Sequence, residues 1–161
     1  MNYAGQLQRK RFAEDERLKG NEFMKSKEYQ DAVNSYTKSL ELMEEPATYS
    51  NRAMAYLKLK NYNQVVEDAN AALKIDSKYL KAYHRRGKAY FELRKYEQAI
   101  KDFQYILERE PDNKDINQSL MDARYRLNNP GSEPEPKKTQ SKPQTASPQQ
   151  EVPKPAPKLE E

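Results

Sequence analysis

Five polar side chains are spaced so that together they could bind carboxylates. Arg17 and Asn21 are four residues apart, and so are Lys81 and Arg85, so each pair would project from one face of a helix. Asn51 lies 34 residues before Arg85. All five side chains carry N–H donors, and hydrogen bonds between cations and carboxylates are strong. A groove that collected them would suit a doubly charged acidic end, namely a C-terminal carboxylate beside an Asp or Glu side chain.

An internal repeat of about 34 residues would supply the helices that position these side chains. Residues 13–129 contain only two prolines and two glycines, and apolar residues recur there with the helical period. Each copy is therefore predicted to be two antiparallel helices joined by a short turn, which bury their apolar faces by stacking on neighbouring copies. Equivalent positions share a residue type in three copies: Gly20, Ala53 and Gly87; Phe23, Tyr56 and Tyr90; Ala32, Val65 and Ala99.

The third copy, with Gly87, Tyr90, Ala99, Phe103 and Pro111, resembles the tetratricopeptide repeat. The resemblance implies an all-α fold of three helix-turn-helix repeats in a right-handed superhelix, whose first helices line a concave groove. The repeats are expected at about 13–45, 46–79 and 80–113.

The segments on either side of the repeats differ from them in character. Residues 1–12 are predicted to be an N-terminal extension to a domain of residues 13–129. Residues 112–128 are predicted to form a capping helix with a polar outer face. Residues 130–161 hold eight of the ten prolines and none of the sixteen aromatic residues, which predicts a disordered Pro-rich tail. The apolar stripe of the capping helix would comprise Ile116, Leu120, Ala123 and Leu127.

The five polar residues also match the carboxylate clamp of tetratricopeptide co-chaperones. That pattern is a basic residue four before an Asn in the first repeat, an Asn in the second, and Lys-x-x-x-Arg in the third. In this respect the chain resembles repeat domains of heat-shock organising protein and sperm-associated antigen 1. The resemblance implies an adaptor that binds the Glu-Glu-Val-Asp tails of seventy- and ninety-kilodalton heat-shock chaperones through Arg17, Asn21, Asn51, Lys81 and Arg85. Secondary peptide contacts are expected on the same helix faces, from Met54, Lys58 and Lys88.

Composition excludes several other classes of function. The absence of Cys and the single His leave no disulfide, thiol nucleophile or zinc cluster, and no phosphate-binding loop occurs. We therefore expect no enzymatic activity, no cofactor and no metal. The longest apolar run, residues 53–57, is far shorter than the roughly 20 residues that span a bilayer. A cytoplasmic monomer without membrane contact is expected.

Two other binding functions fit the same helices. The groove or the outer face could hold a non-chaperone partner, such as a client or a subunit of a larger assembly. Nucleic acid is a third candidate, but 29 basic against 25 acidic residues is a weak surplus for that purpose. Loss of partner binding on mutation of Lys81 and Arg85 would favour the clamp over the scaffold.

Overall fold

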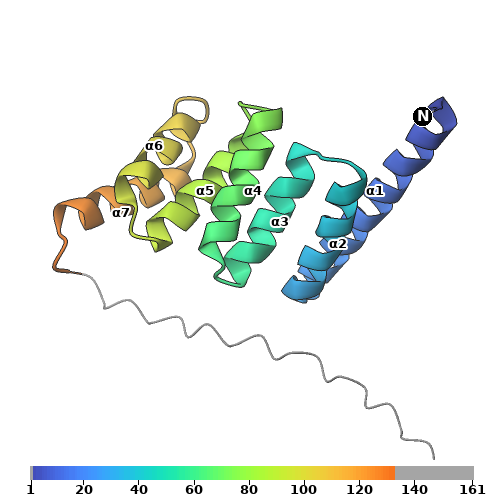
Figure 1. Cartoon of the computed structure of the whole chain (residues 1–161). Helices are drawn as coiled ribbons and strands as arrows, with labels where there is room; N and C mark the ends of the chain where they lie inside the picture. Colours follow the sequence, from blue (N-terminus) through green and yellow to red (C-terminus); the bar gives the residue numbers. More distant parts are fainter. Residues whose placement is uncertain (1, 133–161) are drawn as a thin grey trace, which may run out of the picture.

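The computed structural model describes residues 2–132, which form seven α-helices and no strand (Figure 1). The all-α class predicted from the sequence is confirmed. The first helix begins at Tyr3, so most of the predicted N-terminal extension is continuous with it. The predicted Pro-rich tail lies almost wholly outside the described residues. The helices are α1 (Tyr3–Lys25), α2 (Tyr29–Leu42), α3 (Pro46–Lys58), α4 (Tyr62–Ile75), α5 (Leu80–Glu92), α6 (Tyr96–Leu107) and α7 (Lys114–Asn128).

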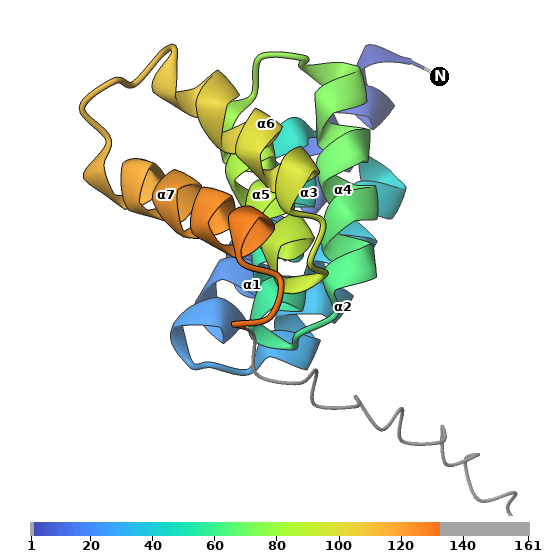
Figure 2. The same cartoon turned by 90° about the vertical axis from the view of Figure 1, so that its left-hand side faces the viewer.

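The helices form three hairpins that stack in chain order, with α7 at the end of the row (Figures 1 and 2). Within each hairpin the two helices contact one another, and the second helix also contacts the first helix of the next hairpin. The first helices contact each other as well, α1 with α3 and α3 with α5. The three predicted repeats and the C-terminal capping helix are therefore confirmed, and the first helices lie side by side.

The turn inside each hairpin has the same backbone geometry three times. Lys27, Lys60 and Arg94 have φ values of 62°, 60° and 59°, in the left-handed region. The next amide in each turn donates to the carbonyl five residues earlier, which is the Schellman arrangement that ends a helix. These bonds are Glu28 N to Phe23 O at 2.9 Å, Asn61 N to Tyr56 O at 2.9 Å and Lys95 N to Tyr90 O at 2.8 Å.

Close packing between the helices of a hairpin explains the glycines of the repeat. A Cβ atom on Gly20 would lie 2.6 Å from Cε1 of Tyr36, and one on Gly87 would lie 2.7 Å from Cε1 of Phe103. Both rings are 1% exposed and have no room to retreat. The second repeat has alanine in both places. A large ring on one helix is therefore matched by a missing side chain on its partner.

The last helix covers the open side of the third hairpin. Ile116, Leu120 and Ala123 are buried and form one cluster with apolar residues of α6. Leu127 was predicted to lie on the same buried stripe but is 40% exposed. It belongs to the last turn of α7, beyond the last buried residue of the helix.

Two buried ion pairs recur in the second and third hairpins. Nε and Nη2 of Arg52 donate to the two carboxylate oxygens of Asp68 at 2.8 and 2.7 Å. Arg86 holds Asp102 in the same way at 2.9 and 2.7 Å. Each arginine also donates from Nη1 to the second helix of the preceding hairpin, so it joins two repeats. These acceptors are Thr37 and Asn70.

Candidate functional site

The five predicted carboxylate-binding residues all lie on first helices. These helices are neighbours, α1 with α3 and α3 with α5. Arg17 and Asn21 belong to α1, Asn51 to α3, and Lys81 and Arg85 to α5.

The two asparagines are in direct contact. The side-chain amide of Asn51 donates to Oδ1 of Asn21 at 3.1 Å, and the hydroxyl of Tyr36 donates to the same oxygen at 2.7 Å. With two donors on its carbonyl oxygen, Asn21 turns its NH₂ group away, where it can donate to a ligand. Tyr36 is 1% exposed, so this orientation is held from the core.

Tyr36 was not among the site residues predicted from the sequence. The signal that could have revealed its second role is its hydroxyl, because the equivalent positions hold Ala69 and Phe103, which cannot donate. At this repeat position, among the described residues, the first repeat alone has a hydroxyl that can bond to a side-chain amide, that of Asn21.

Tyr79 is influenced by charges from both the first and the third repeat. Burial raises the pKa of Tyr79, and the positive charges of Arg85 and Arg17 oppose that rise. Arg85 lies on α5 and Arg17 on α1, two helices from different hairpins. Both guanidinium groups therefore act on one hydroxyl, while the carboxylate of Asp76 acts on it in the opposite sense.

The two arginines differ in how far they are neutralised. Arg17 Nη2 lies 3.7 Å from Glu14 Oε1, and Arg17 Nε lies 4.0 Å from Glu45 Oε2. Among the described residues Arg85 has no ion pair, and its Nε, like that of Arg17, is buried without a hydrogen-bond partner. Burial lowers the pKa of Arg85, which marks a cation deprived of water. Binding of an anion to such a group is favourable, because the anion replaces the lost interactions with water.

Lys81 has the fewest described contacts of the five residues. Its side chain is exposed, and no hydrogen bond or ion pair ties it to the other four. It lies one helical turn before Arg85 on α5. The structure thus brings Asn21 and Asn51 into contact and lets the charges of Arg17 and Arg85 both act on Tyr79, whereas no described contact joins Lys81 to the other four.

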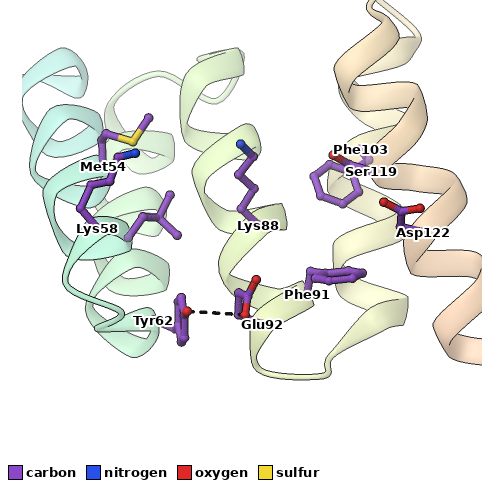
Figure 3. A pocket seen from close by; sticks show the side chains of 10 residues that line it. Met54, Lys58, Tyr62, Lys88, Phe91, Glu92, Phe103, Ser119 and Asp122 are labelled. Carbon is purple, nitrogen blue, oxygen red and sulfur yellow. Dashed lines mark hydrogen bonds between the residues drawn. The ribbon is translucent and has the colours of Figure 1, made fainter. Parts of the chain in front are cut away.

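The three secondary residues, Met54, Lys58 and Lys88, line one cavity of about 380 Å³ (Figure 3). Its wall combines apolar side chains with both signs of charge. Ser119 and Asp122 reach it from α7, a contribution that the sequence did not predict. Tyr62, at the start of α4, donates its hydroxyl to Oε2 of Glu92 at 3.5 Å. The remaining lining residues are Leu57, Phe91 and Phe103.

Other kinds of site find little support in the described part of the chain. Residues 2–132 contain no group of three or more His, Asp or Glu side chains that could hold a metal ion. No helix in this range is long and apolar enough to cross a membrane. The single histidine, His84, is half-buried beside Arg85, and its pKa is lowered to about 4, chiefly by burial.

Comparison with known proteins identifies the family. Models of the tetratricopeptide repeat match residues 46–79 and 80–113. The first such domain of Spaghetti (RPAP3), solved with the HSP90 peptide SRMEEVD, superimposes with a TM-score of 0.71 at 36% identity, over 73% of this chain and 97% of that one. The chain belongs to the tetratricopeptide repeat family.

Two further relatives are similar to this chain. The second such domain of human RPAP3, in complex with the HSP70 peptide SGPTIEEVD, matches with a TM-score of 0.66 at 32% identity, over 74% of this chain and 98% of that one. The small glutamine-rich tetratricopeptide repeat-containing protein 2 of Saccharomyces cerevisiae is 33% identical over 102 residues, which are 63% of this chain. The match covers only 30% of the yeast protein's length.

Proposed function

We propose that this chain is a protein-interaction module that binds the acidic C-terminal tails of HSP70- and HSP90-class chaperones. In this proposal Arg17, Asn21, Asn51 and Arg85, with Lys81, form a clamp for the terminal carboxylate and the adjacent acidic side chain. Two relatives with matching folds are solved with such tails, SRMEEVD and SGPTIEEVD.

The observation that carries the proposal is the half-buried Arg85, which has no ion pair among the described residues. A half-buried guanidinium without a carboxylate lowers the stability of the folded protein, whereas a fully exposed arginine would not. Its neighbour in sequence, Arg86, is fully paired with Asp102, so the chain does supply acidic partners where the fold requires them. An acidic ligand would provide the missing partner of Arg85.

The cavity lined by Met54 supports a second part of the proposal. Both tails carry an apolar residue, Met or Ile, directly before Glu-Glu-Val-Asp. Met54, Leu57 and Phe91 offer an apolar wall of the right chemistry, and Met is an adaptable packing partner. Lys58 and Lys88 would attract the glutamates that follow in the tail.

Calorimetric titration with SRMEEVD tests the proposal. Arg85→Ala should weaken binding about tenfold to a hundredfold, because losing one partner of a charge pair costs roughly 1–3 kcal/mol in a groove open to water. Amidating the terminal carboxylate of the peptide should cost about as much. Lys60→Ala, a change of an exposed lysine in a turn, is the matched control and should bind like the parent.

Native helicity by circular dichroism must accompany each variant. An Arg85→Ala protein that is folded and binds SRMEEVD as tightly as the parent would exclude the clamp. In that case the scaffold function, with a non-chaperone partner on the same fold, takes its place.

Three further expectations belong to this proposal. The module acts by binding and not by catalysis, as is typical of the repeat domains it resembles. A cytoplasmic location and a monomeric state remain predictions from the sequence.

A further inference from the structure

Arg85 differs from the neighbouring arginine on α5 in how it is held. Arg86 is fixed by both oxygens of Asp102, which also cancel its charge. The one hydrogen bond described for Arg85 runs from its Nη1 to Nδ1 of His84, at 3.2 Å. Both side chains are half-buried.

The chemistry of this contact fixes the state of the histidine. A guanidinium group can only donate hydrogen bonds, so Nδ1 of His84 must accept, and the imidazole must be neutral with its proton on Nε2. The surroundings favour that state, because burial and the charges of Arg85 and Lys88 lower the pKa of His84 to about 4, whereas Asp115 on α7 opposes them.

From this contact we infer that His84 is a positioning residue for peptide binding, which holds the Arg85 guanidinium in place without neutralising it. The inference rests on the proposed clamp function. An unrestrained arginine side chain would lose considerable rotamer entropy when it bound a ligand. A carboxylate would hold it equally well but would compete with the acidic ligand. A neutral acceptor avoids both costs.

Binding of the peptide SRMEEVD at pH 7 to substituted full-length chains tests this inference. His84→Phe keeps a planar ring but removes the acceptor, so binding should weaken about threefold to tenfold. His84→Asn is smaller but places a carbonyl oxygen near the position of Nδ1, so binding should stay within about twofold of the parent. A residue that only fills space would give the opposite order, with Phe tolerated better than Asn.

A double-mutant cycle separates an effect through Arg85 from any other effect. In an Arg85→Ala background, His84→Phe should change the affinity by less than about 1.5-fold. Equal losses from His84→Phe with and without Arg85, or no loss in the parent, would overturn the positioning role while the clamp stands. If Arg85→Ala alone leaves the affinity unchanged, the clamp itself is excluded and the positioning role with it. Circular dichroism of every variant confirms that the helices are intact.

Discussion

At the scale of single residues, the orientation of a proposed binding residue, Asn21, depends on a buried side chain. Tyr36 is buried in the first hairpin, yet its hydroxyl fixes the carbonyl oxygen of Asn21. Asn51 donates to the same oxygen from the next repeat. The amide of Asn21 is thus oriented by the core of one repeat and by a side chain of the next.

Tyr36→Phe should therefore affect both stability and binding. Loss of one buried hydrogen bond should lower the free energy of unfolding by about 0.5–1.5 kcal/mol and weaken binding of SRMEEVD about twofold to fivefold. Urea denaturation and calorimetry measure the two effects. Tyr29→Phe, on the same helix but with no hydrogen bond described for its hydroxyl, is the control, and equal effects of the two substitutions would contradict the role of Tyr36.

His84 should make stability depend on pH. Its pKa is about 4 in the folded protein and near 6.5 when unfolded, so the unfolded chain alone binds the proton between these values. The contribution of neutral His84 is fully present above pH 6.5 and declines as the pH falls toward 4. The surrounding charges are Arg85 and Lys88 on α5 and Asp115 on α7.

The comparison variant is His84→Phe, which does not titrate. Between pH 7 and pH 5 the parent should lose about 1 kcal/mol more than this variant, after allowance for partial exposure of the ring to water. Urea unfolding at several pH values measures the difference in stability between the two proteins. The carboxylates titrate equally in both, so their effect cancels in this difference. Parallel stability curves for the two proteins would rule out a depressed pKa for His84.

At the scale of helices, stability depends on whether each hairpin is covered by its neighbour. The third hairpin has no following repeat among the described residues, and α7 covers it. Leu120 is 6% exposed within the cluster that α7 forms with α6. Leu127, about two turns further along the helix, is 40% exposed. The two leucines therefore report on the covered and uncovered parts of one helix.

Leu120→Ala should lower the free energy of unfolding by about 2–4 kcal/mol, because it removes buried methyl groups and leaves a cavity. Leu127→Ala on the same helix should cost less than about 1 kcal/mol, since much of its surface already meets water. Urea midpoints give both values. Similar losses from the two substitutions would mean that α7 does not cap the stack as described.

At the scale of the whole molecule, the net charge is small, while one half-buried cation, Arg85, has no ion pair among the described residues. The chain carries a net charge of +4 at pH 7. The arginines of the second and third hairpins that face Asp68 and Asp102 are neutralised there, whereas Arg85 is not. Long-range attraction of polyanions should therefore be weak, while short-range pairing in the groove remains available.

Salt should accordingly weaken peptide binding only moderately. Two or three charge contacts predict a loss of about twofold to tenfold in affinity for SRMEEVD between 50 and 200 mM salt, against about a thousandfold or more for a protein with six or more phosphate contacts. Calorimetry across this range, with a single-stranded oligonucleotide as a second ligand, measures it. Tight oligonucleotide binding with a steep salt dependence would favour a nucleic-acid function instead.

The sequence alone determined the features that depend on local periodicity. The recurrence of Gly20, Ala53 and Gly87 predicted three hairpins, and the spacing of Arg17 from Asn21 and of Lys81 from Arg85 placed each pair on one helix face. Such features follow from 3.6 residues per turn and a repeat length, both of which can be read along the chain.

Only the tertiary structure decided which side chains meet. Three features depend on how far each hairpin is rotated relative to the one before it. Asn51 contacts Asn21, and the charges of Arg17 and Arg85 both act on Tyr79. Ser119 of α7 lines the cavity. The sequence does not show which of the two neighbouring arginines on α5, Arg85 or Arg86, forms an ion pair with a carboxylate. Small rotations between repeats add up along the stack, so contacts between residues tens of positions apart are fixed by packing and not by periodicity.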